Sequence, residues 1–173
     1  MTEAAARAAE EGRLMLRKHI LTDLPAGRAR RSDVKDIPAL ATVLVTSEAP
    51  DHPVDHLFDA SDGPGGTRWI AAADGEQTLV LAFDAPQTIR AVGIEAEEPG
   101  ATRTNVLIIS LSDDGGRTYR ERIRQEFNFS PGTSFEREEW SMPAERVTHV
   151  RIVIQPDKGN APRRATLTSL TVR

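Results

Sequence analysis

The sequence of 173 residues contains no cysteine. That absence excludes a disulfide framework, a thiolate zinc site and a cysteine nucleophile, and it is typical of a reducing environment. No apolar run approaches the roughly 20 residues that a membrane-spanning helix needs. The N-terminal segment has alanine and acidic residues where a signal peptide has a basic start and an apolar run. We therefore expect a cytoplasmic, bacterial type of protein that does not enter a membrane.

The residues that are present indicate one folded domain. Apolar residues make up 39% of the chain and are joined by 12 glycines, an ordinary composition for a globular protein of this length. Residues 1–40 hold 8 Lys and Arg against 6 Asp and Glu, whereas residues 41–173 hold 14 against 20. The acidic main domain disfavours binding to a nucleic-acid backbone.

The N-terminal segment predicts a helix over residues 2–22. It is rich in alanine, with acidic residues near its start and basic residues near its end, as the helix dipole favours. Leu16, Ile20 and Leu24 are four apart and form a narrow apolar stripe. The stripe packs on its own domain or, alternatively, makes a contact in a homo-oligomer. We predict that residues 1–36 comprise this helix and a polar linker.

Residues 37–173, the predicted main domain, show short strands separated by turns. Leu79, Leu81 and Phe83 alternate with residues of the opposite face, as in a half-buried strand. The crossover helices that parallel strands need are missing from the pattern. The prediction is an all-β, antiparallel jelly-roll β-sandwich with an N-terminal α-helix. The predicted strands are residues 41–47, 77–84, 88–97, 104–112, 117–129, 135–140, 148–155 and 165–172.

The turn "HLFDASDGPGGTRW", residues 56–69, is rich in aspartate and glycine. An EF-hand loop that started at Asp59 would need glycine and glutamate where Pro64 and Ile70 stand. No Gly-Lys-Ser/Thr follows the glycines, so the turn is not a P-loop. We interpret it as a loop of residues that accept positive φ and that deliver Trp69 to a strand and to the core.

A second turn, "SDDGGRTY" at residues 112–119, predicts a tight hairpin around Asp114 to Gly116. It also resembles the Asp-box of sialidase propellers. A propeller needs several copies of that motif and a longer chain, so a single copy indicates only a hairpin.

The segment "DHPVDHLFD", residues 51–59, brings His52 and His56 together with three aspartates, so an acid/base pair or a zinc site has to be considered. Pro53 opposes the helix that would align the two histidines. The sequence contains no Gly-x-Ser-x-Gly, HExxH, Walker or dinucleotide-binding pattern. We predict no catalytic residues and no enzymatic activity.

Several sequence segments follow one another along the chain in this order: "LFD", "TRW", "TLVLAFDAPQTIRAVGIEA", "VLIISLSDDGGRTY", "VTHVRIVI" and "ATLTSLTV". Over residues 40–173 this order resembles the discoidin or coagulation-factor C-type domains and the family 32 carbohydrate-binding modules, which belong to the galactose-binding-like superfamily. The resemblance implies a jelly-roll sandwich with Trp69 in its core. It also implies a non-catalytic binding module.

Many relatives hold a calcium ion beneath their ligand loops. The resemblance implies Asp59 and Thr67 as metal ligands, together with main-chain carbonyls and a last-strand glutamate that is Ser169 in this chain. Losing that carboxylate removes charge and a strong ligand from a hard-cation site. We expect no required cofactor, with a structural calcium ion as the alternative, and little effect of EDTA on the melting temperature.

The resemblance places ligand recognition in three loops at one end of the sandwich, residues 50–57, 95–103 and 156–164. None of them contains an aromatic residue for stacking on a sugar, or an apolar spike for a membrane. We predict a small polar ligand, such as a saccharide or a protein segment. The candidate ligand-binding residues are His52, Glu97, Arg103, Asp157, Lys158, Asn160 and Arg163.

Two alternatives remain at this point. A cytosolic interaction or assembly protein would build an oligomer from the N-terminal helix and a sheet face. A nucleic-acid-binding domain would need Arg28, Arg30, Arg31, Arg163 and Arg164 on one face.

Overall fold

The computed structural model describes residues 33–173. The predicted helix over residues 2–22, its apolar stripe and the arginines at 28, 30 and 31 lie outside the described residues. The elements in order are α2 (Ile37–Leu40), β1 (Ala41–Val45), η1 (Val54–Leu57), β2 (Trp69–Asp74), β3 (Gln77–Glu97), β4 (Arg103–Ser112), β5 (Arg120–Phe129), β6 (Phe135–Gln155), β7 (Arg164–Leu167) and β8 (Ser169–Val172).

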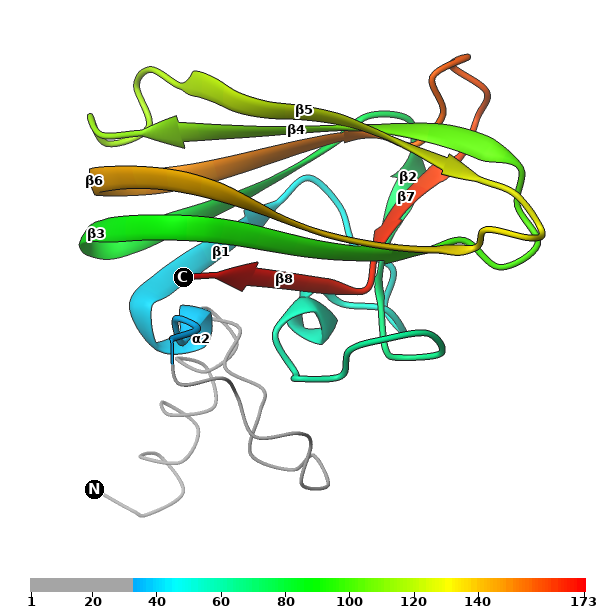
Figure 1. The fold of residues 1–173 in the computed structure, drawn as a ribbon, viewed down its shortest axis with the longest axis horizontal. Helices are drawn as coiled ribbons and strands as arrows, with labels where there is room; N and C mark the ends of the chain where they lie inside the picture. The colour runs from blue at the N-terminus through cyan, green and yellow to red at the C-terminus, as the bar shows by residue number, and fades with distance from the viewer. Residues whose placement is uncertain (1–32) are drawn as a thin grey trace, which may run out of the picture.

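The long strands β3 and β6 pair antiparallel along their whole length and run through both layers of the sandwich (Figure 1). One layer has the order β1-β3-β6-β4-β5 and uses the first half of β3 with the second half of β6. The other layer joins the second half of β3 to β8 and to the first half of β6. Register shifts between Ala82 and Ala91 mark the corner where β3 passes from one layer to the other. This is the antiparallel sandwich that the sequence predicts.

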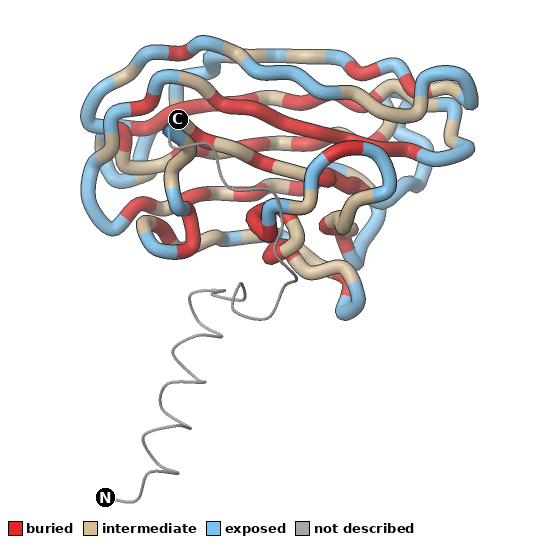
Figure 2. Tube along the Cα trace, turned by 60° about the horizontal axis from the view of Figure 1, so that its bottom comes forward, coloured by how far each residue is buried: buried red, intermediate tan, exposed pale blue. Residues whose placement is uncertain are grey.

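The core lies between these two layers, where Figure 2 shows buried positions along the long strands and exposed positions at the turns. Leu79 and Leu81 of β3 are fully buried, and Phe83 is 9% exposed. In the same sheet, Leu79 pairs in register with Ile152 of β6, which pairs in turn with Ile109 of β4, and both isoleucines are fully buried. The alternation read from the sequence therefore identifies the inward face of β3 correctly.

Trp69 opens β2 directly after the glycine-rich turn and is fully buried. Its indole Nε1 donates a hydrogen bond to the carbonyl oxygen of Ser47 at 3.1 Å. A buried indole N–H needs such a partner, so the ring fills the core without leaving a donor unsatisfied. The prediction that Trp69 enters the core is confirmed.

The strand boundaries differ from the prediction in several places. The segments 77–84 and 88–97 form one bent strand, as do 135–140 and 148–155, because the turn residues between them lie at the corners of a continuous ladder. The predicted strand 165–172 breaks at Thr168, whose N–H donates to the carbonyl oxygen of Glu95. The strand β2 is the one to which the turn was expected to deliver Trp69, but no range was predicted for it, because three consecutive alanines give it little alternation.

Candidate functional site

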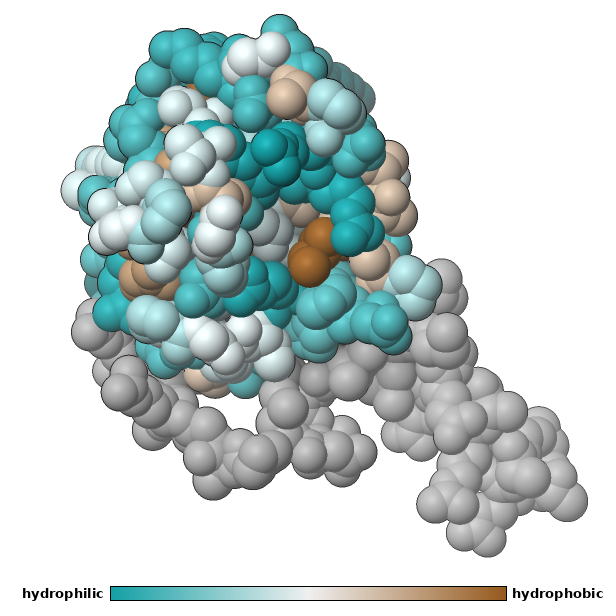
Figure 3. All heavy atoms as spheres, turned by 90° about the vertical axis from the view of Figure 1, so that its right-hand side faces the viewer, coloured by the Kyte–Doolittle hydropathy of each residue, from teal (hydrophilic) through white to brown (hydrophobic). Residues whose placement is uncertain are grey.

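The loop before β4, the β5–β6 turn and the 156–164 loop lie at one end of the sandwich, at the right of Figure 1. The N–H of Lys158 donates to the carbonyl oxygen of Thr104 at 2.8 Å, which joins the 156–164 loop to the start of β4. The N–H of Glu98 donates to the carbonyl oxygen of Ser134 at 2.7 Å, which joins the 95–103 loop to the β5–β6 turn. Figure 3 looks onto this end, which is mostly hydrophilic and has a hollow with a small hydrophobic spot.

A buried ion pair forms the centre of this end. The guanidinium of Arg103 contacts the carboxylate of Glu98, and the two side chains are only 5% and 9% exposed. Arg103 also donates from its second terminal nitrogen to the carbonyl oxygen of Arg164 at 3.2 Å. Asn105, which is 2% exposed, donates to the same Glu98 oxygen at 3.5 Å. The pair fixes the end of β4 against the last loop.

The charges of the 156–164 loop affect the pKa of Arg103. Burial is the main cause that lowers the pKa of its guanidinium, and the positive charge of Arg163 lowers it further, whereas Asp157 raises it. Asp157 accepts the N–H of Gly159 at 2.7 Å, and Arg163 is exposed. The structure thus brings three predicted residues, Arg103, Asp157 and Arg163, into one electrostatic group.

Two other predicted residues of this loop are engaged nearer to β5 and β6. The ammonium group of Lys158 pairs with Glu126 of β5 at 2.7 Å. The side-chain oxygen of Asn160 accepts a hydrogen bond from Gln155 at the end of β6 at 2.9 Å. Both side chains lie at the loop end, but in this arrangement they contact the neighbouring strands.

Glu97 connects this group to the glycine-rich loop. Its carboxylate oxygen Oε2 accepts the guanidinium of Arg68 at 2.9 Å and the N–H of Gly65 at 2.9 Å. The carbonyl oxygen of Arg68 lies 2.8 Å from Nδ1 of His56. The rings of His56 and His52 meet edge to face at 6.3 Å between centroids. Through Arg68, the predicted residues Glu97 and His52 belong to one connected set.

The loop 59–68 contains the two predicted metal ligands, and they bond to each other. The hydroxyl of Thr67 donates to Oδ2 of Asp59 at 2.5 Å, and Oδ1 of Asp59 accepts the N–H of Ser61 at 2.8 Å. Ser169, which stands at the position of the last-strand glutamate, pairs in register with Glu95 of β3. Within residues 33–173 no group of three or more His, Cys, Asp or Glu side chains is arranged to hold a metal ion. A calcium ion takes six to eight oxygen ligands, so Asp59 and Thr67 would supply only part of its coordination shell.

Glu98, Arg68 and Phe135 lie in or beside this set, and sequence reasoning missed them as site residues. Phe135 is a partly exposed aromatic residue that pairs in register with Glu97, and the guanidinium of Arg137 lies 5.6 Å from its ring centroid. It belongs to β6, a strand next to β3 in space but distant in sequence. A search confined to three loops could not find it.

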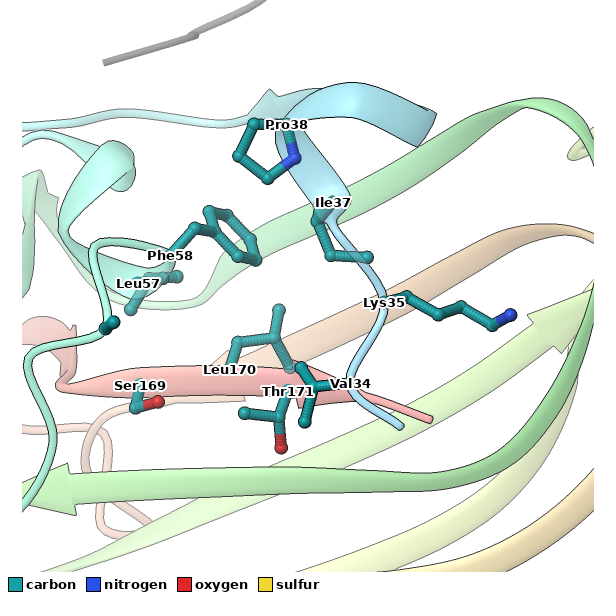
Figure 4. A pocket seen from close by; sticks show the side chains of 10 residues that line it. Val34, Lys35, Ile37, Pro38, Leu57, Phe58, Ser169, Leu170 and Thr171 are labelled. Atoms are coloured by element: carbon teal, nitrogen blue, oxygen red, sulfur yellow. The ribbon is translucent and has the colours of Figure 1, made fainter. Parts of the chain in front are cut away.

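A pocket lies apart from the loop end, between α2, η1 and β8 (Figure 4). Ile37, Phe58 and Leu170 converge on it, whereas Lys35 points away and donates to Gln87 at 3.3 Å. Its volume is about 60 Å³, well below the size of a typical small-molecule site. Apolar walls and small size make it a poor site for a polar ligand.

Solved structures share this fold. A pectin-binding carbohydrate-binding module is 19% identical, with a TM-score of 0.54 over 78% of this chain and 90% of that chain. The CBM32 of AlyQ, in complex with 4,5-unsaturated mannuronic acid, is 21% identical, with a TM-score of 0.55 over 78% and 95%. The family 32 module of Clostridium perfringens NanJ, in complex with galactose, is 15% identical, with a TM-score of 0.55 over 80% and 96%.

No protein-family model matches the sequence, and no curated protein matches it either. The likeness therefore establishes the architecture: an antiparallel β-sandwich of the kind found in family 32 carbohydrate-binding modules. In the part of the chain from residue 33 onward, no helix is long and apolar enough to cross a membrane.

Proposed function

We propose that the chain is a non-catalytic carbohydrate-binding module that holds a saccharide at the loop end. The main support is that the loop end joins charged groups from separate loops in one hydrophilic, hollowed face (Figure 3). The solved structures with this fold include modules that bind pectin, mannuronic acid and galactose. They do not favour the assembly or nucleic-acid alternatives.

The residues that would contact a sugar are those with groups near the surface of this end. Asp157 and Arg163 would accept from and donate to sugar hydroxyls, and His52 would offer a further polar group. Arg103 and Glu97 are already held by ion-pair partners, so they would position the loops. Phe135 is the partly exposed aromatic residue closest in the ladder to Glu97, and it would offer a face for stacking.

The proposal includes no catalytic step and no required cofactor. The carboxylates Glu95, Glu97 and Glu98 each form an ion pair with an arginine. Among the described residues, His52 and His56 are not part of any group of three or more side chains that could hold a metal ion. A binding role would use these charges in the ion pairs that they already form.

The experiment is a glycan array followed by NMR titration of the full chain with each positive glycan. We expect chemical-shift changes at residues of the 156–164 loop, and a loss of binding of about tenfold or more in Asp157→Ala, because a hydrogen bond to a charged group is removed. Arg117→Ala, at the opposite end of β4, is the control and should bind normally. Absence of any glycan binding, or shifts confined to the opposite end, would refute the proposal.

A further inference from the structure

The loop 59–68 presents backbone N–H groups to carboxylates. The N–H of Gly63 donates to Oε2 of Glu95 at 2.7 Å in a buried hydrogen bond. Two residues later, the N–H of Gly65 donates to Oε2 of Glu97 at 2.9 Å. Both glycines have positive φ, 82° and 77°, a conformation that glycine adopts without strain. The side of this loop that faces Glu95 and Glu97 therefore presents N–H groups, which carry partial positive charge.

The charge balance of the loop agrees with this polarity. The second oxygen of Glu95 accepts Nε of Arg137 at 2.6 Å, and Glu97 accepts Arg68 at 2.9 Å. The two glutamate side chains are 10% and 11% exposed, and a carboxylate with so little contact with water needs a partner of opposite charge. Each carboxylate is thus held by one loop N–H and one arginine.

We infer that this loop is closed by two anions instead of a metal cation: Glu95 and Glu97 of β3 occupy a site built for carboxylates, with Arg137 and Arg68 as their counter-charges. A calcium site needs carbonyl and carboxylate oxygens pointing at one centre. Here loop N–H groups point at the carboxylates, which is the opposite polarity. Glu95 pairs in register with Ser169 of β8. The carboxylate at this place in the ladder therefore comes from β3, because β8 offers only a serine.

The inference has two consequences. Calcium has no site to stabilise, so the wild-type chain should melt at the same temperature in calcium and in EDTA. Removing the Glu95 side chain should leave the Gly63 N–H and Arg137 facing a small cavity that accepts an added carboxylate. Acetate is the matched probe, because it carries the carboxylate of glutamate on a single methyl group.

The experiment measures thermal melting of the full chain. We expect the melting temperature of wild type to shift by less than about 1 °C between calcium and EDTA. Glu95→Ala should melt lower than wild type, and sodium acetate should raise its melting temperature more than sodium chloride of equal ionic strength. The amide resonance of Gly63 should move with acetate in this variant.

Glu95→Gln is the control, because its side chain fills the cavity and should remove the specific acetate effect. Glu97→Ala, which leaves the Gly65 N–H and Arg68, provides the same test if Glu95→Ala does not fold. A calcium-induced rise of several degrees in wild type would overturn the inference. So would a folded alanine variant that responds equally to acetate and chloride. Neither readout depends on a sugar, so the result is separate from the proposed function.

Discussion

The two turns rich in aspartate and glycine are held in different ways. In the hairpin 112–119 the carboxylate of Asp114 accepts the N–H groups of Arg117 and Thr118 and the hydroxyls of Ser112 and Thr118, all within four residues. In the loop 59–68, the partners of Gly63 and Gly65 are glutamates 32 residues away on β3. The hairpin is held mainly by its own residues, with one further bond from the N–H of Gly115 to Thr148 of β6 at 3.0 Å. The loop 59–68 has local bonds too, such as that of Thr67 to Asp59, but its glycines are held by the sheet beneath it. Similar composition therefore does not imply a similar origin of structure.

The largest expected effect comes from removing Trp69, the buried residue that follows the loop 59–68. Trp69→Ala should lower the free energy of unfolding by about 3–5 kcal/mol, because a fully buried indole is replaced by a cavity. Tyr119→Ala, at the end of the hairpin, should cost much less because Tyr119 is partly exposed. Urea unfolding of both variants measures the difference. Equal losses would contradict the contrast between the two turns.

The second prediction removes one distant contact of the loop. Glu97→Gln keeps the shape of the side chain but loses the charge that pairs with Arg68, and should cost about 1–3 kcal/mol. Amide exchange at Gly65 should also become faster. Glu121→Gln is the control, because its pair with Arg124 on β5 is exposed and contributes little. A loss no larger than that of the control would mean that the loop does not depend on β3.

A smaller effect is expected from a purely local change. Gly115 has φ of 78° and open space where the Cβ of an alanine would lie, so Gly115→Ala adds backbone strain without a clash. Its cost should be about 1–2 kcal/mol, confined to the hairpin. Hydrogen exchange should show faster opening there and no change at Gly63. Spread of the effect into the 59–68 loop would show that the two turns are coupled.

The smallest and most local effect concerns acid. The hydroxyl of Thr118 first, then the N–H of Thr118 and the hydroxyl of Ser112, hold the pKa of Asp114 well below its ordinary value. The stabilisation is therefore complete above the unfolded pKa of about 4 and is lost as pH falls through the lower folded pKa. The protection of the Gly116 and Thr118 amides, measured relative to their intrinsic exchange rates, should fall below about pH 4 in wild type.

Asp114→Asn should remove this acid dependence, because the amide does not titrate. The wild-type and variant hairpins should then differ most above about pH 4 and converge in strong acid. Parallel acid profiles in the two proteins would contradict the role of Asp114.

The sequence predicted the parts of the fold that depend on neighbouring residues. The alternation of Leu79 and Leu81, the turn residues and the buried Trp69 all follow from local chemistry. The corners of β3 and β6 were wrongly predicted to be strand ends. An interruption of the apolar alternation looks the same in sequence whether the strand ends there or bends together with its partner. The three ligand loops were located by resemblance, and the ligand-binding roles of their residues stay predictions, as does a cytoplasmic location.

The site was harder to predict because its partners come from different strands. Nothing in the sequence near Arg103 indicates that Glu98 would bury its charge, and Phe135 lies outside the three predicted ligand loops. The Glu95 and Glu97 contacts with Arg137 and Arg68 likewise depend on the register between β3 and β6 and on where the loop crosses β3.

The sequence alone determined an antiparallel sandwich, because the period of two along each strand fixes which side chains can be buried, and it determined the 112–119 hairpin, because its hydrogen-bonding groups lie within a few residues of one another. Only the tertiary structure decided which charges meet at the loop end and that the 59–68 loop closes on glutamates. Those contacts join residues far apart in the chain, and electrostatic pairing depends on distance in space.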